Sequence, residues 1–192
     1  LHSFPPRRSS DLYREVLSKA NEFVGYLPNA EAVEPDTKLG LDDMFELVRK
    51  ADEDYRTLQE KKARLKQKIE EYRAKQQIVA PFRPVECDLH RVLHYRYITY
   101  RFGRIAVEFY HKMQKYLMDD LKAIFVEGER DESYVYGVYF VSQAETQKVD
   151  AVFRSLHFER IELKDEFEGT PDTAYRVLEN EIARVNLEIE DL

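Results

Sequence analysis

Three residues near the middle of the chain have the spacing of half a zinc site. Cys87, His90 and His94 form the pattern C-x2-H-x3-H, which can place a thiol and two imidazoles on one helical face. A closed structural zinc site needs four ligands, and two other histidines, His111 and His157, are isolated in the sequence. We therefore expect no metal site, and ordinary packing or surface roles for these residues.

A strand-like run over residues 134–141 carries apolar side chains on both of its faces. One face has an aromatic series of the kind on which RNA-recognition domains stack bases: Tyr134, Tyr136, Val138 and Phe140. The other face is equally apolar, with Val135, Tyr139 and Val141. The basic Gly-Phe-Gly pattern of RNA-recognition domains does not occur. A central strand buried on both sides explains the run better, and we expect no nucleic-acid partner.

Other catalytic or nucleotide-binding patterns are missing from the sequence. The glycines at positions 25, 40, 103, 128, 137 and 169 are scattered, and none is followed by Gly-Lys-Ser or Gly-Lys-Thr. No Ser-His-Asp set and no carboxylate pair can be argued, because the acidic residues fall on predicted helix exteriors. We expect a chain that is not an enzyme, with no catalytic residue, no cofactor and no small-molecule substrate.

The composition favours one core with solvated helical arms. The chain has 192 residues, of which 43% are hydrophobic and 35% charged, and its net charge is -7, which disfavours nonspecific binding to nucleic acid. Cys87 is the only cysteine, so no internal disulfide can form. No apolar run approaches the roughly 20 residues that span a bilayer, and the first residues contain no signal-peptide core.

An unbroken repeat of three and four residues predicts one long helix over residues 41–79. Ten of its twelve positions are apolar, and a mean spacing of about 3.5 is typical of a coiled-coil seam. Pro81 and Pro84 should end the helix. The twelve positions are Leu41, Met44, Val48, Ala51, Tyr55, Leu58, Lys62, Leu65, Ile69, Tyr72, Gln76 and Val79.

A second helix with the same repeat is predicted from Pro171 to the end of the chain. Gly169 breaks the preceding segment, Thr170 can cap the helix, and Pro171 suits its first position. Two such helices flanking one lobe favour an antiparallel coiled coil, in which basic residues of 60–68 face acidic residues of 179–191. The predicted seam contains Leu58, Leu65, Ile69, Tyr72, Leu178, Ile182, Val185 and Ile189.

Residues 80–168 read as a compact lobe with the order β-α-β-β-α-β, a ferredoxin-like sandwich with two helices on one face of a sheet. Within the lobe, a short helix over 86–95 precedes the first strand. We expect strands at 97–102, ended by Gly103, and at 121–126, 134–141 and 157–163. Helices are expected over 105–117 and after a capping box at 142–145, with a polar turn at 128–132. The fold class is therefore α+β, a long two-helix coiled coil capped by this lobe.

The first part of the chain is less regular. Residues 1–12 (LHSFPPRRSSDL) resemble the translation of a commercial sequencing adapter, and we treat them as a non-native tail outside the fold. Residues 13–27 carry a helical repeat, and Pro28 to Gly40 reads as a loop. The predicted regions are 1–12, a helix and first arm over 13–79, the lobe over 80–168, and a second arm over 169–192.

Several motifs in the second half of the chain occur in an order that resembles a known family. They are YVYGVYFV at 134–141, then a helix, then FRSLHFER at 153–160 and GTP at 169–171 opening a coiled-coil helix. RFGRI at 101–105 fits that family's strand-to-helix turn in the lobe. In this order the motifs resemble subunit I of bacterial and archaeal V-type ATPases, the relative of subunit a of the eukaryotic vacuolar proton pump, over about residues 13–192.

This resemblance implies a stator component of a rotary V-type ATPase. The family's cytosolic half is a two-helix coiled coil with an α/β lobe at each end, and residues 80–168 would be the lobe far from the membrane. The near lobe and the membrane domain that carries ions would be absent, and the full protein would sit at the cytoplasmic face of the cell membrane. Partners would be the peripheral stalks and other subunits of the ATPase. The alternative is a generic coiled-coil adaptor with an interaction lobe.

A group of arginines at the start of the lobe is the candidate partner-binding set. Only Glu86 and Asp88 offset this positive charge between residues 82 and 104, although the whole chain is acidic. We hypothesise that the set faces acidic helices of a peripheral stalk, and the alternative is an ordinary solvated face. Its members are Arg83, Arg91, Arg96, Arg101 and Arg104.

Overall fold

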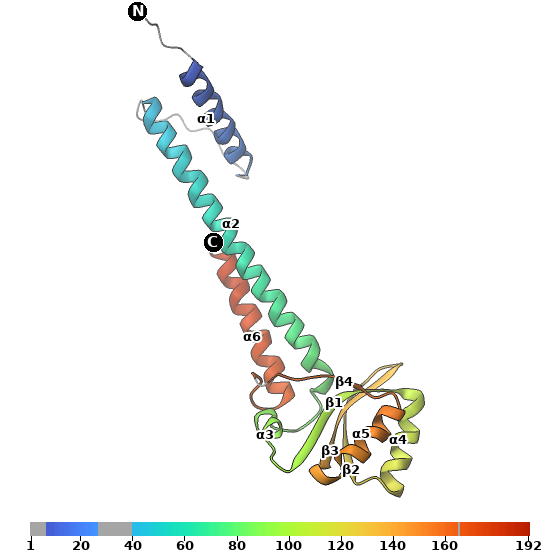
Figure 1. Ribbon diagram of the computed structural model, residues 1–192. Helices are drawn as coiled ribbons and strands as arrows, with labels where there is room; N and C mark the ends of the chain where they lie inside the picture. The colour runs from blue at the N-terminus through green and yellow to red at the C-terminus, as the bar shows by residue number, and fades with distance from the viewer. Residues whose placement is uncertain (1–6, 27–39, 165) are drawn as a thin grey trace, which may run out of the picture. The chain divides into compact units, whose positions relative to one another are not determined.

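The computed structural model of the chain describes residues 7–26, 40–164 and 166–192 (Figure 1). The chain forms two compact units: Leu1–Arg64 together with Leu192, and Leu65–Asp191. The loop expected between Pro28 and Gly40 lies outside the described residues, except for Gly40 itself.

The first unit pairs helix α1 (Arg7–Gly25) with the first part of helix α2 (Leu41–Val79). The two helices run in the same direction (Figure 1). Near the end of α1, Tyr26 stacks on Tyr55 of α2 at 4.8 Å between ring centroids, and Phe23 meets the same ring edge-on at 6.0 Å. The helix expected from Tyr13 therefore exists, but it begins at Arg7, because no glycine or proline interrupts residues 7–12.

Helix α2 has the bounds that its repeat predicts. A 3₁₀ turn, η1 (Ala80–Phe82), follows Val79 directly and contains Pro81, which ends the α-helix as expected. Ion pairs between residues three and four apart support the solvated face, such as Arg49 with Glu46 and with Glu53, both at 2.8 Å.

The second unit contains a four-stranded antiparallel sheet with the strand order β2-β3-β1-β4. Its strands are β1 (Ile98–Ala106), β2 (Ala123–Arg130), β3 (Tyr134–Ser142) and β4 (Glu159–Arg160). Helix α4 (Val107–Asp119) joins β1 to β2, and helix α5 (Thr146–Ser155) joins β3 to β4. The predicted α+β class and the order β-α-β-β-α-β are confirmed.

The prediction that Gly103 ends a strand is wrong. Strand β1 continues through Gly103 to Ala106, so Ile105 is a buried strand residue and not the start of the next helix. The glycine is needed inside the strand because a side chain there would collide with the Glu159 carbonyl and the Phe158 ring. It marks a close approach of β4, and not an end.

Two further strand limits differ from the expectations. Residues 128–130 belong to β2 and not to a turn, and the turn follows at Asp131, whose carboxylate accepts hydrogen bonds from the backbone N–H groups of Ser133 and Tyr134, both at 2.7 Å. The last strand, expected over 157–163, is only Glu159–Arg160, since the chain then leaves the sheet and buries Leu163 against the other face.

The capping box expected at residues 142–145 does not form. Ser142 makes no side-chain capping hydrogen bond, and a 3₁₀ turn, η2 (Gln143–Glu145), separates it from α5. The hydroxyl of Thr146 instead donates to the Ser142 carbonyl at 3.1 Å. Because the 3₁₀ turn moves the helix start, serine and glutamate no longer occupy the positions that a capping box requires.

Helix α6 (Pro171–Glu190) starts as predicted. The Thr170 hydroxyl accepts a hydrogen bond from the Thr173 N–H at 3.2 Å, Pro171 follows at the first helical position, and Gly169 has a φ of 73°. Residues 65–79 of α2 and helix α6 lie side by side in opposite directions (Figure 1). The Gln76 side-chain amide donates to the Tyr175 carbonyl at 3.4 Å across this pair.

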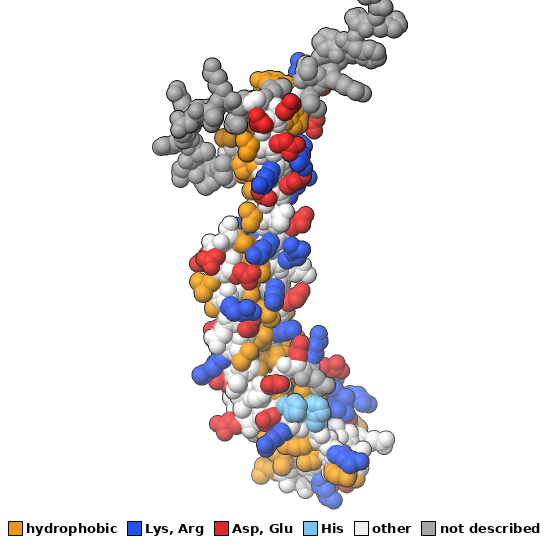
Figure 2. Space-filling model, turned by 90° about the vertical axis from the view of Figure 1, so that its left-hand side faces the viewer, with side chains coloured by type: hydrophobic (Ala, Val, Ile, Leu, Met, Phe, Trp, Pro, Cys, Tyr) orange, Lys and Arg blue, Asp and Glu red, His pale blue; other side chains and the backbone are white. Residues whose placement is uncertain are grey.

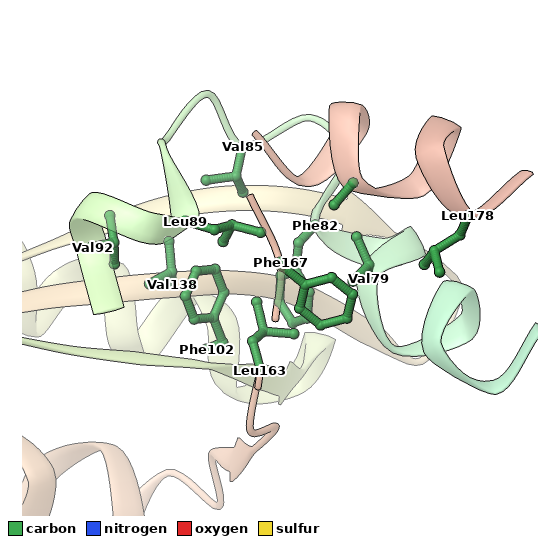
Figure 3. Packing of buried hydrophobic residues seen from close by; sticks show 11 residues of the cluster. Val79, Phe82, Val85, Leu89, Val92, Phe102, Val138, Leu163, Phe167 and Leu178 are labelled. Atoms are coloured by element: carbon green, nitrogen blue, oxygen red, sulfur yellow. The ribbon is translucent and has the colours of Figure 1, made fainter. Parts of the chain in front are cut away.

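Both faces of the sheet are covered. On one side, which we call the helix face, α4 and α5 bury Ile105, Tyr139, Val149 and Phe153. The other side, which we call the joint face, is covered by the lobe ends of α2 and α6, by helix α3 (Leu89–Leu93) and by the segment after β4 (Figure 3). The joint face contains Val79, Phe82, Val85, Leu89, Val92, Phe102, Val138, Leu163, Phe167, Ala174 and Leu178.

Candidate partner-binding surface

The structure does not gather the five candidate arginines on one surface. Successive residues of a strand point to opposite faces of a sheet, so the odd and even positions of β1 separate. Arg101 pairs with Asp150 of α5, on the helix face. Arg104 lies on the same side of the strand as Phe102, which belongs to the joint face. A single docking patch made of all five side chains is therefore excluded.

Arg83 lies half-buried at the edge of the joint face. Its Nε donates to the Asp172 carboxylate at 2.8 Å, and its guanidinium lies 4.2 Å from the centre of the Tyr175 ring. The hydrogen bond to Asp172 raises the pKa of Arg83 above its ordinary value. The contact links the chain just after η1 to the first turn of α6.

Arg104 is held in a similar way on β1, between β3 and the short edge strand β4. Its guanidinium donates to Glu159 at 2.7 Å and lies 3.9 Å from the centre of the Tyr134 ring. Hydrogen bonds to the Tyr136 hydroxyl and to Glu159 raise the pKa of Arg104. The guanidinium of Arg104 thus forms an ion pair within the lobe, between β1 and β4.

Arg91 and Arg96 are different, because both are exposed and neither guanidinium has an ion-pair partner among the described residues. Exposed His90, His94, Tyr95 and Tyr97 lie around them in the sequence, with Tyr97 at 72% exposure. We call residues 90–97 the α3 surface. Figure 2 shows histidine and basic side chains together on one side of the lobe. Of the predicted set, Arg91 and Arg96 are the two members whose side chains are exposed.

The zinc-like pattern does not form a metal site in the residues that the structure describes, where no group of three potential ligands occurs. The His90 and His94 rings lie 4.7 Å apart, and Nδ1 of His94 donates to the His90 carbonyl at 2.7 Å. Burial raises the pKa of the Cys87 thiol to about 11, so the thiolate that a metal would need is disfavoured.

The predicted seam residues fall into two groups. In the second unit, Ile69, Leu178 and Val185 are buried, whereas the other four are half-buried: Leu65, Tyr72, Ile182 and Ile189. Leu58, in the first unit, is 41% exposed. The repeat therefore identifies a buried face on residues 65–79 and α6, and coiled-coil packing of the two helices stays a prediction.

The sequence did not reveal the polar centre of the helix face. The Asp150 carboxylate accepts hydrogen bonds from Tyr139 Oη at 2.6 Å and from Arg101 Nη2 at 3.3 Å, and pairs with Arg160 Nη2 at 2.8 Å. Burial alone would raise the pKa of Asp150, but these three partners outweigh it and lower the pKa. A hint was available, because Asp150 directly follows Val149 on a helix that packs against the sheet.

The aromatic face of β3 is covered by the segments that pack on the joint face. Val138 is fully buried, and the Tyr136 ring meets Phe82 edge-on at 6.3 Å between centroids. Tyr136 and Phe140 pack against the same core. As expected for a central strand, these side chains form a core and not an open surface on which bases could stack.

No helix among the described residues combines the length and the apolar character needed to cross a membrane. No protein-family model matches the chain, and no curated protein matches it. Among solved structures, one match is the cytoplasmic N-terminal domain of subunit I, a homologue of subunit a, of V-ATPase. The match has a TM-score of 0.49 and 15% sequence identity, and covers 97% of this chain and 65% of that chain.

That neighbour belongs to the family that the sequence motifs resemble. At this identity and TM-score the similarity assigns neither a family nor a function to the chain.

Proposed function

We propose that the chain is part of the stator of a rotary V-type ATPase, and that it links a peripheral stalk to the membrane sector. The support comes first from the order of the sequence motifs at 134–141, 153–160 and 169–171. In the structure these fall on β3, on the end of α5 with β4, and on the start of α6. In this proposal the ions pass through a membrane domain that is not among these 192 residues.

The observation that carries the proposal is the shared core at the joint. Val79 at the end of α2 and Leu178 on α6 belong to one buried cluster with Phe102 and Val138 of the sheet (Figure 3). A stator must pass a sideways force from one end to the other without bending at a flexible connection. Close-packed side chains resist such displacement, whereas an exposed loop would not.

We further propose that residues 65–79 and α6 act as a coiled coil, and that the lobe is a ferredoxin-like sandwich. The 3,4 repeat on both helices and their opposite directions support the first point. The strand order β2-β3-β1-β4, with both crossover helices on one face, supports the second.

Docking of the stalk is proposed for the α3 surface, through Arg91 and Arg96. Each of the other three arginines is half-buried and paired with a carboxylate, so this exposed pair is what remains for an acidic stalk helix. Because exposed charges act mainly on association, the complex should weaken as salt rises.

A pull-down with the purified peripheral-stalk heterodimer tests the proposal. The natural chain should bind, and Arg91→Glu with Arg96→Glu should weaken binding at least about tenfold at low salt. Lys112→Glu with Lys115→Glu, on the exposed side of α4, is the matched control with the same change in charge, and it should bind normally. No binding by the natural chain would favour a generic adaptor, and equal losses in both variants would exclude the α3 surface.

A further inference from the structure

The cover of the joint face ends before it reaches the start of β2. Val126 packs against the core of this face, and Ile124 lies two residues away on the same side of the strand. The Ile124 side chain is nevertheless 67% exposed. The strand register places it beside Phe140 of β3, which in turn lies beside Tyr100 of β1. An apolar row therefore crosses three strands, and its β2 end is open to solvent.

The row continues toward helix α3. Ile98, two residues before Tyr100 on the same side of β1, is 43% exposed. Val92 of α3 is buried in the core against which Phe140 packs, so α3 borders the row. Figure 2 shows hydrophobic side chains next to the histidines on this side of the lobe. Neighbouring apolar side chains of this kind mark interaction sites more often than single exposed ones do. We call the group the tip patch: Ile98, Tyr100, Ile124 and Phe140.

The charge beside the tip patch is positive. Arg91 and Arg96 of the α3 surface are exposed, and so is Lys122, which precedes Ile124 by two residues on β2. No carboxylate of the described residues forms an ion pair with Lys122. The sequence contains no acidic residue between positions 89 and 107. The surroundings of the patch therefore favour an acidic partner.

Acidic residues near β2 belong to the opposite side of the sheet. Asp119 and Asp120 lie at the end of α4, which covers the helix face. Glu127 of β2 accepts a hydrogen bond from the Tyr110 hydroxyl of α4 at 2.6 Å. These carboxylates therefore do not neutralise the basic side chains on the joint side.

We propose that the tip patch receives a partner helix that is apolar along one side and acidic beside it. The row from Ile124 to Tyr100 spans two interstrand spacings, about 10 Å, which is close to two turns of an α-helix. Apolar residues at positions i, i+3 or i+4, and i+7 of the partner would lie along the row. Acidic residues next to them would meet Arg91, Arg96 and Lys122. A second copy of this chain fits less well, because a two-fold contact would bring the same basic side chains together.

This inference deepens the proposed docking of the stalk and rests on it for the choice of partner. It differs in what provides the affinity. Exposed arginines act mainly on association and are screened by salt, whereas apolar side chains buried in an interface mainly slow dissociation. Arginines alone predict a complex that salt abolishes, and the tip patch predicts an affinity that remains at high salt.

Binding of the purified peripheral-stalk heterodimer to the full chain, followed in real time at low and high salt, tests the inference. Ile124→Gln should raise the dissociation constant at least about tenfold at both salt concentrations, mainly through faster dissociation. Met118→Gln, which changes an 86% exposed side chain at the end of α4, is the matched control and should bind as the natural chain does. Circular dichroism of each variant confirms that the fold is intact.

The possible results separate this inference from the proposed function. Normal binding by Ile124→Gln, or an equal loss in Met118→Gln, would overturn the tip patch and leave the stator role standing. Binding by the natural chain that disappears at high salt would do the same. Self-association of the chain that Ile124→Gln abolishes would assign the patch to a second copy and overturn the inference. A natural chain that does not bind the stalk at any salt concentration would overturn both.

Discussion

The two faces of the sheet are buried by different kinds of segment. The helix face is covered by α4 and α5, each of which connects two strands of the same sheet. The joint face is covered by segments from far apart in the chain, including Val79 and Phe82 before the sheet and Leu163 and Leu178 after it. The first kind of cover completes a lobe, whereas the second attaches the lobe to two long helices.

The two faces also differ in their polar groups. On the helix face, Asp150 sits among Tyr139, Arg101 and Arg160, so hydrogen bonds fix the position of α5 against β1, β3 and β4. The joint face has an apolar interior with ion pairs beside it, such as Arg83 with Asp172 and Lys75 with Glu166. Close packing of apolar side chains must therefore stabilise the joint face, while hydrogen bonds and ion pairs help to stabilise the helix face.

The largest effects on stability should come from truncating one large buried side chain in each core. Phe82→Ala at the joint and Phe153→Ala on the helix face remove side chains that are 0% and 1% exposed, and each should lower the free energy of unfolding by about 3–5 kcal/mol. Hydrogen exchange separates the two: Phe82→Ala should speed exchange at the start of α6, and Phe153→Ala in α5. The same exchange pattern in both variants would mean that the faces do not unfold separately.

The next effect should come from the polar centre of the helix face. Asp150→Asn leaves Arg101 and Arg160 without their carboxylate and should cost about 2 kcal/mol of unfolding free energy at pH 7. Because folding lowers the pKa of Asp150, its contribution is present above the unfolded pKa of about 3.9 and is lost as pH falls through the folded pKa.

Urea unfolding of both proteins at pH 7 and near pH 3 measures this. The difference in unfolding free energy between the natural chain and the variant should be smaller at the lower pH. A difference of constant size would show that the charge of Asp150 contributes nothing to stability.

A smaller effect should come from the cap that starts α6 at the joint. Thr170→Ala removes the acceptor for the Thr173 N–H and should cost about 1 kcal/mol of unfolding free energy in thermal or urea unfolding. Thr170→Ser keeps the hydroxyl and serves as the control, with near-natural stability. Equal losses in the two variants would point to packing of the threonine methyl group instead.

The smallest effect is expected at the edge of the joint. Arg83→Gln breaks a partly exposed ion pair with Asp172 and the contact with Tyr175, so the melting temperature should fall slightly at low salt, and the difference should shrink as salt screens the pair. Arg73→Gln, which breaks an ion pair within α2, is the comparison. A loss at Arg83 that is independent of salt would assign its role to stacking on Tyr175.

Local signals in the sequence predicted the elements well. The 3,4 repeat fixed both bounds of α2, and Gly169, Thr170 and Pro171 located the start of α6, because periodicity and capping act within a few residues. Strand limits were less predictable. Gly103 read as a breaker but sits inside β1, since its role depends on Phe158 and Glu159, which are distant in the sequence.

The amino-acid sequence by itself determined the helix repeats, the order of strands and helices, and the acidic character of the chain. The tertiary structure alone decided which arginines stay exposed, because Arg101, Arg104 and Arg83 meet their carboxylates 49, 55 and 89 residues away. It also decided that the second face of the sheet receives the two long helices. Such contacts depend on how distant segments fold together, and no local spacing encodes them.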